Sequence, residues 1–126
     1  MRTLIIAMGF HSLFFAVFHM LFWTKLHWNK ELPKLSNVNN AVMQILNLRL
    51  IHYFLFLTVL CFAFTDSLLH SPLGAATLLG SALFWLGRAL EQLIFKQLLP
   101  VRAPISIVLS LLFVLGFIGF LLPVIL

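Results

Sequence analysis

The sequence predicts an all-α integral membrane protein, a four-helix transmembrane bundle. Hydrophobic residues make up 63% of its 126 residues and charged residues only 9%, whereas a soluble domain carries roughly 25% charged residues. Four apolar runs follow one another, each about the 20 residues that a helix needs to cross some 30 Å of hydrocarbon. A chain this short has too little interior to hide so much apolar surface from water. We therefore expect one domain, residues 1–126, in a lipid bilayer.

The predicted spans cover about residues 3–23, 41–64, 73–95 and 105–126. Backbone groups in lipid must be hydrogen-bonded within their own segment, so each run is expected to be a helix. The first run is longer than the apolar region of a signal peptide. No small-residue cleavage pattern follows it, so we interpret it as a retained span.

Lysine and arginine between the spans predict the orientation. Segments 24–40 and 96–104 contain five basic residues, whereas the opposite side has only Arg2. The positive-inside rule therefore places both segments in the cytoplasm and both termini outside, in the cytoplasmic membrane of a bacterium. The five basic residues are Lys25, Lys30, Lys34, Lys96 and Arg102.

The basic character of the chain does not predict nucleic-acid binding. The net charge is +5, but the basic residues lie mostly between apolar runs and form no face with interleaved aromatic residues. Topology and attraction to anionic lipid headgroups account for them. Cys61 is the one cysteine, which excludes an internal disulfide or a Cys-x-x-Cys pair. We expect Cys61 to be a packing residue.

Segment 24–40 is more than a plain linker. Leucines and a tryptophan alternate there with charged residues, a pattern typical of a segment in the headgroup layer. Trp23 and Trp28 are predicted to face the membrane interface. Ser36 is positioned to cap the second span, and Pro33 is expected to end any helix that arrives from the first.

Polar side chains inside the spans are the strongest functional signal, because they are costly in lipid and tend to face the interior of a bundle. Estimated depths rise from roughly 6 Å for His19 and Glu91 to roughly 17–18 Å for His11 and His52. We expect these side chains to form a pocket that opens toward the cytoplasm. The candidate ligand or ion pocket consists of His11, His19, Gln44, Asn47, Arg49, His52, Arg88 and Glu91.

Helical spacing supports a shared polar interior. Arg88 and Glu91 are three residues apart, so they lie on one face and can pair, and Arg49 and His52 have the same spacing. Two arginines then face one glutamate, and the excess positive charge calls for an anion, a headgroup, a ligand or water. Structural alternatives stay open, namely an Arg88–Glu91 ion pair, a snorkelling Arg49 and histidines that hydrogen-bond neighbouring helices.

Small residues predict close contacts between helices. In the third span Ala76, Gly80 and Gly87 follow one another at intervals of four and seven residues, and in the fourth span Gly116 and Gly119 lie near one face. At this length a transport unit is expected to be a homo-oligomer.

The pattern favours binding or transport of a small ligand, an ion or a proton. A basic pocket suits an anion or an amphipathic, lipid-like molecule, and histidine titrates near neutral pH. Three alternatives stay open. The first is b-type haem held by His11 and His52. The second is a small membrane enzyme that acts on a lipid or thiol through Arg88 and Glu91. The third is an accessory subunit of a larger membrane complex.

Overall fold

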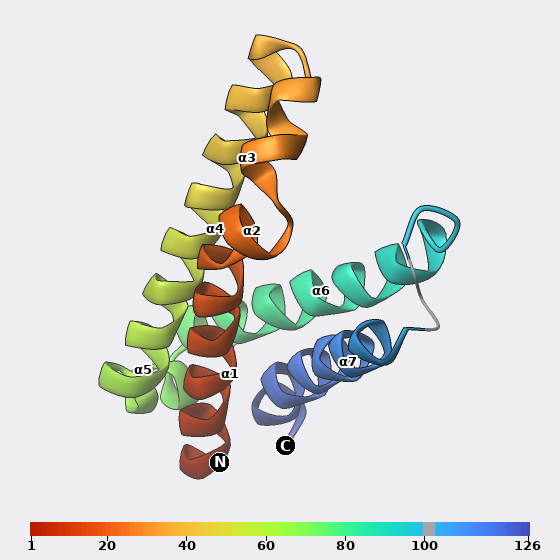
Figure 1. The fold of residues 1–126 in the computed structure, drawn as a ribbon. Coiled ribbons are helices and arrows are strands. Elements are labelled where there is room, and N and C mark those ends of the chain that lie inside the picture. Colours follow the sequence, from red (N-terminus) through yellow and green to blue (C-terminus); the bar gives the residue numbers. More distant parts are fainter. Residues whose placement is uncertain (100–102) are drawn as a thin grey trace. The chain divides into compact units, whose positions relative to one another are not determined.

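The computed structural model describes residues 1–99 and 103–126 and is helical in the described part, which confirms the all-α fold class (Figure 1). Its long helices are long and apolar enough to cross a membrane. They lie within about one turn of the predicted spans, the usual uncertainty of helix ends. They are α1 (Arg2–Met20), α4 (Asn37–Ala63), α6 (Pro72–Ile94) and α7 (Pro104–Ile125).

Short helices connect the long ones. Between α1 and α4 lie α2 (Phe22–Lys25), α3 (Trp28–Glu31) and the 3-10 helix η1 (Leu32–Lys34), and α5 (Thr65–His70) precedes α6. The chain forms two compact units, one of residues 9–63 and one of residues 1–8 and 64–126. A single domain over residues 1–126 stays a prediction.

Side-chain caps and prolines set the helix starts. The Ser36 hydroxyl accepts a hydrogen bond from the backbone N–H of Asn39 at 3.2 Å, which confirms the predicted cap of α4. The Ser71 hydroxyl accepts one from the N–H of Gly74 at 2.9 Å at the start of α6. Pro72 and Pro104 begin α6 and α7, where a missing N–H costs nothing.

In the unit of residues 1–8 and 64–126, α6 and α7 pack against each other. The rings of Trp85 and Phe113 stack there with centroids 5.8 Å apart. Gly119 is buried under the Met8 side chain, as expected for a close helix contact. A Cβ at Gly80 or Gly87, in contrast, would meet no described atom within 4 Å, so these glycines do not bring α6 close to another described helix.

The same unit contains an ion pair near the N-terminus. The Arg2 guanidinium donates to the Asp66 carboxylate of α5 at 2.6 Å. The N-terminus and the connection between the second and third spans therefore lie together, as in the predicted four-span path. Which side of the membrane is cytoplasmic stays a prediction.

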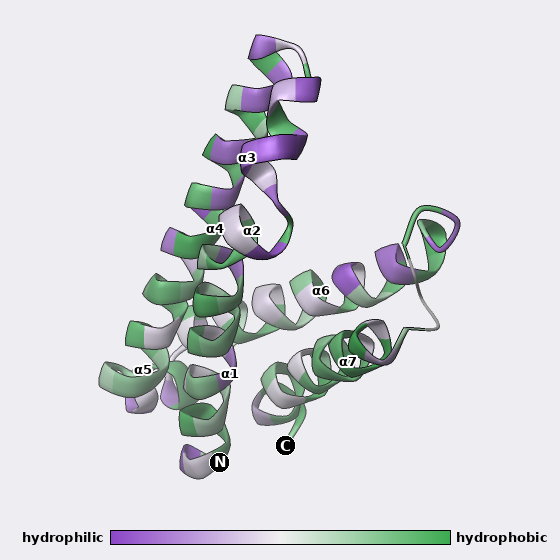
Figure 2. Ribbon diagram, in the orientation of Figure 1, coloured by the Kyte–Doolittle hydropathy of each residue, from purple (hydrophilic) through white to green (hydrophobic). Residues whose placement is uncertain are grey.

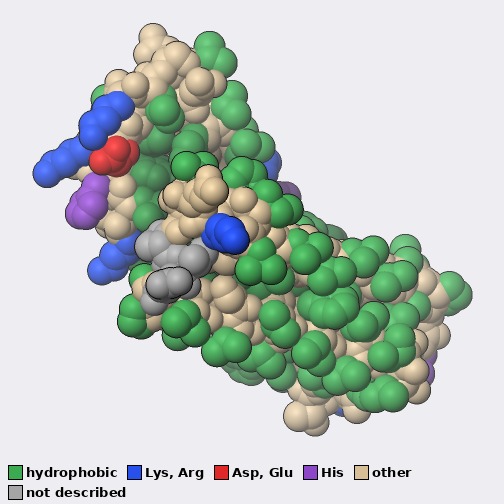
Figure 3. Space-filling view, turned by 90° about the vertical axis from the view of Figure 1, so that its right-hand side faces the viewer, with side chains coloured by type: hydrophobic (Ala, Val, Ile, Leu, Met, Phe, Trp, Pro, Cys, Tyr) green, Lys and Arg blue, Asp and Glu red, His purple; other side chains and the backbone are tan. Residues whose placement is uncertain are grey.

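The surface is apolar to an extent that requires lipid. Figure 2 shows α7 hydrophobic along its length, whereas hydrophilic residues in α4 gather toward its first turns. In Figure 3 hydrophobic side chains cover most of one face, and charged and histidine side chains gather in a small part of it. Large apolar side chains such as Leu83, Ile107 and Leu111 are at least half exposed. Water does not tolerate apolar patches of this extent, so the chain is an integral membrane protein.

Candidate functional site

The candidate site lies in the unit of residues 9–63, where the later turns of α1 pack on α4. The ring centroids of Phe10 and Phe62 are 5.0 Å apart, and those of Phe15 and Phe54 are 6.0 Å apart. One residue number rises as the other falls, so the two helices are antiparallel. Gly9 lets the Phe62 ring approach the α1 backbone, because a Cβ there would collide with that ring.

His19 and Asn47 form a two-bond pair across these helices. The Nδ1 atom of His19 lies 2.8 Å from Oδ1 of Asn47, and Nδ2 of Asn47 donates to the backbone carbonyl of His19 at 2.9 Å. Asn47 is only 4% exposed. The imidazole also packs on Phe22 and Phe54, with centroid distances of 4.4 and 5.4 Å. These contacts fix the orientation of the ring.

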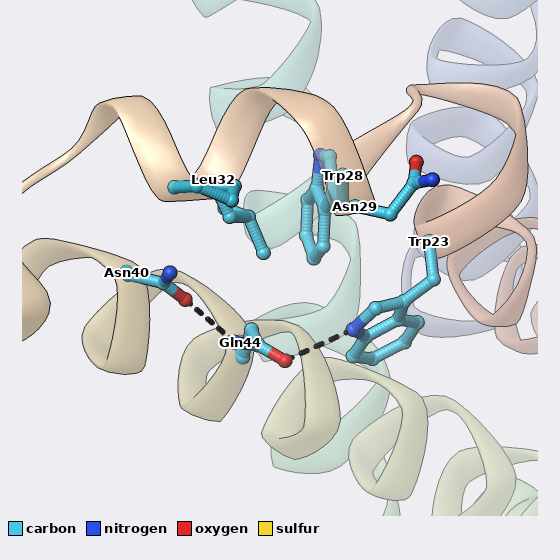
Figure 4. Close-up of a pocket in the computed structure, with 7 residues that line it drawn as sticks. Trp23, Trp28, Asn29, Leu32, Asn40 and Gln44 are labelled. Carbon is cyan, nitrogen blue, oxygen red and sulfur yellow. Dashed lines mark hydrogen bonds between the residues drawn. The ribbon is translucent and has the colours of Figure 1, made fainter.

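A second polar link lies close to this pair. The indole N–H of Trp23 donates to Oε1 of Gln44 at 3.1 Å, and Nε2 of Gln44 donates to Oδ1 of Asn40 at 2.6 Å (Figure 4). Both ends of the Gln44 amide are thus hydrogen-bonded, as a partly buried amide requires. Asn40, Gln44 and Asn47 therefore face α1 and the segment that follows it.

The connection from α1 to α4 folds back on itself at His27. His27 adopts the left-handed conformation (φ 54°, ψ 46°), which is uncommon for residues other than glycine. Trp28 and Leu32 follow and are each 5% exposed. Trp28 packs edge to face on Trp23 at 5.3 Å. The Trp28 ring is therefore buried within this unit, and its level at the membrane interface stays a prediction.

Two hollows flank Trp28. The smaller one, about 230 Å³, is lined by the residues of the Trp23–Gln44 link together with Trp28, Asn29, Leu32 and Pro33 (Figure 4). The larger one is a groove of about 530 Å³ along α4, which we name the His19 groove. Apolar and aromatic side chains form most of its wall, and the other lining residues are a histidine and two asparagines. The lining is Phe22, Trp28, Leu35, Val42, Met43, Leu46 and Leu50, with His19, Asn39 and Asn47.

Arg49 and His52 lie on a different face of α4. Both side chains are exposed, and within the described chain Arg49 makes no hydrogen bond or ion pair. The helical rotation of 100° per residue puts Arg49 about 200° around α4 from Asn47. The face that carries Gln44 and Asn47 packs toward α1, so Arg49 and His52 are left outside the His19 groove.

His11 does not lie opposite His52. Its ring is half-buried and packs on Phe15 at 5.0 Å. The Phe10–Phe62 and Phe15–Phe54 contacts place His11 opposite the stretch between residues 54 and 62, about 12 Å along the axis from His52. Two axial haem ligands must lie at one level on opposite sides of the iron. His11 and His52 therefore do not fit b-type haem within this unit.

Arg88, Glu91 and the buried Gln92 belong to the other unit. The guanidinium carbon of Arg88 lies 4.5 Å from the centre of the Phe113 ring, a cation–π geometry. Glu91 is exposed, and the ion pairs among the described residues are Arg2–Asp66 and Lys34–Glu31. In the described chain Arg88 and Glu91 therefore do not form the ion pair that was one of the structural alternatives. Gln92, which the sequence analysis did not single out, is 5% exposed.

The partners that hold the polar residues were not predicted from the sequence. Trp23 and Trp28 read as interfacial aromatics, yet one donates to Gln44 and the other separates the two hollows. A usable signal existed, since an indole N–H away from water needs an acceptor and Gln44 is one of the amides in the adjoining span. Asn39, a further groove residue, gave no signal beyond its amide. Arg102 belongs to residues 100–102, which lie outside the described residues.

No family model matches the chain, and the searches of curated proteins and of solved structures found no match. The class of protein is therefore set by the fold alone, a small four-span membrane protein.

Proposed function

We propose that this membrane protein binds an amphipathic, lipid-like ligand in the His19 groove. The observation that carries the proposal is the groove itself, an apolar hollow of about 530 Å³ with a partly buried polar pair in its wall. Ligand sites commonly have volumes of about 300–1,000 Å³ and combine apolar walls with a few placed polar groups. The lining of the groove follows that composition.

The two parts of the lining suit the two parts of an amphiphile. Val42, Leu46 and Leu50 succeed one another along one face of α4, and this apolar strip offers contact to a hydrocarbon chain. The bilayer competes for the same chain, so apolar contact alone gives little selectivity. His19 and Asn47 supply what hydrocarbon cannot, a fixed polar contact for a headgroup.

Other residues of the predicted pocket have only indirect roles in the proposed ligand binding. Gln44 holds Trp23, which packs on the groove residue Trp28. Arg49 and His52 are candidates for headgroup contacts outside the groove, since both are exposed on α4. Opening toward the cytoplasm, assembly into a homo-oligomer and onward transport of the ligand belong to the proposal and derive from the charge pattern and the length of the chain.

Native mass spectrometry of the protein extracted from membranes tests the proposal. The wild type is expected to retain a non-protein mass that analysis of the extract identifies as an amphiphile. Leu46→Trp fills the groove and should abolish the retained mass. Leu48→Trp is the matched control, because Leu48 is exposed on α4 but does not line the groove. Loss in both variants, or no retained mass in the wild type, contradicts the proposal and favours an accessory or purely structural role.

A further inference from the structure

The smaller hollow beside Trp28 has a lining unlike that of the His19 groove. Its volume is about 230 Å³, and its lining residues come from α2, α3, η1 and the start of α4 (Figure 4). Two indoles, three side-chain amides, a leucine and a proline form its wall, and among the described residues no charged side chain lines it. Whole ligands commonly occupy about 300–1,000 Å³. The smaller hollow therefore suits one small group, such as a single ring or the headgroup of a larger molecule.

The amides in this wall keep hydrogen-bonding capacity for a ligand. Gln44 has both ends of its amide engaged, with Trp23 and with Asn40. Asn40 uses only its oxygen in this link, so its amide nitrogen can still donate. Figure 4 shows that nitrogen on the side of the opposite wall, which carries Leu32. Asn29 makes no hydrogen bond within the described chain, so its amide offers both a donor and an acceptor.

This combination of side chains fits a neutral, hydroxyl-rich group. A hydroxyl both donates and accepts hydrogen bonds, as the free amides require, whereas a charged headgroup would find no countercharge in this lining. Trp23 and Trp28, with ring centroids 5.3 Å apart, add aromatic surface for the C–H groups of a sugar ring. We infer that the smaller hollow is a second binding site, which takes a neutral sugar or a similar polyol. This inference does not depend on the ligand proposed for the His19 groove.

Tryptophan fluorescence of the whole protein reads this site. Trp85→Phe leaves Trp23 and Trp28 as the only tryptophans, and both line the smaller hollow. In phosphatidylcholine nanodiscs, glucosyl diacylglycerol should shift their emission saturably, whereas diacylglycerol and phosphatidic acid with the same chains should not. Methyl glucoside distinguishes the two sources of a sugar: a response to it indicates a free sugar, and a response to the glycolipid alone indicates a lipid headgroup. The wild type, titrated in parallel, checks that Trp85→Phe has not altered the site.

Asn29→Leu then tests the lining itself. It removes an exposed amide that makes no bond in the described chain, so the fold should hold. The half-saturating concentration of the sugar should rise about threefold to tenfold, the worth of one net hydrogen bond. Asn37→Leu is the matched control, because Asn37 is exposed and lines neither hollow. No saturable response to either sugar, an equal response to diacylglycerol or phosphatidic acid, or an equal effect of the two substitutions overturns the inference.

Discussion

Asn47 of α4 both accepts a hydrogen bond from the His19 ring and donates one to the His19 backbone. A single amide thereby sets the position of α1 on α4 and the chemistry of a histidine inside the membrane. Polar contacts of this kind between transmembrane helices are worth about 0.6 kcal/mol on average and up to about 1.7 kcal/mol. Such contacts are modest in energy but specific in geometry, which suits a binding site better than a general role in holding helices together.

The first prediction concerns the energy of this pair. In a double-mutant cycle of His19→Ala and Asn47→Ala, the coupling free energy should be about 0.5–2 kcal/mol. Each single change already removes the hydrogen bond between the two side chains, so the second change has no such bond left to remove. Equilibrium unfolding in mixed detergent micelles measures it. The parallel cycle of His19→Ala with Asn39→Ala should give a coupling close to zero. A coupling equal in the two cycles would show that the bonds seen here do not form in the membrane.

The second prediction concerns the link between Trp23 and Gln44. Trp23→Phe should cost about 1 kcal/mol of unfolding free energy, because it leaves the Gln44 oxygen without its donor in a partly buried site. Gln44→Leu should cost a similar amount, because it leaves the Trp23 indole N–H without its acceptor. The double variant should lose less than the sum, since neither member of the Trp23–Gln44 bond is then left without its partner. Fully additive losses in the same unfolding assay would exclude this hydrogen bond.

The third prediction separates two kinds of glycine in α6. A Cβ at Gly74 would collide with backbone atoms of Ser67 and Leu68, which cannot move without distorting α5. Gly74→Ala should therefore lower the unfolding free energy by about 2 kcal/mol or more. Gly80→Ala meets no described atom and should be neutral, or stabilising by up to about 1 kcal/mol through helix propensity. A destabilising Gly80→Ala would instead point to a second copy of the chain packed on that face.

The fourth prediction concerns Arg88, whose guanidinium lies over the Phe113 ring. A cycle of Arg88→Met and Phe113→Leu should show a favourable coupling of about 0.5–2 kcal/mol, because both changes keep most of the side-chain volume and remove the cation–π contact. A matched cycle of Arg88→Met with Glu91→Gln should show the smaller value, since that ion pair is not closed. The reverse order of the two couplings would restore the ion pair that the sequence suggested.

Fold class and span limits followed from the sequence because they depend on composition and run length, and lipid leaves an apolar chain few alternatives to helices. The cap at Ser36 followed for a similar reason, since a cap is local. The site was harder to predict. Asn47 and Arg49 are two residues apart and equally polar, and only the packing of α1 decides that one is buried and the other exposed.

Depth along the membrane was a poor guide to which polar residues meet. His11 and His52 have similar estimated depths, yet the aromatic contacts between α1 and α4 offset them by more than two turns. The sequence pattern also did not predict how the segment after α1 folds. A left-handed histidine carries no sequence signature comparable to glycine, so the turn at His27 and the burial of Trp28 could not be anticipated.

The most direct test of the account is an experimental structure of the protein in lipid nanodiscs made from its native membrane. We expect an elongated density along Val42, Leu46 and Leu50, with its polar end beside the His19–Asn47 pair. A groove closed by its own side chains, or filled with water while the density lies elsewhere on the chain, would contradict the account.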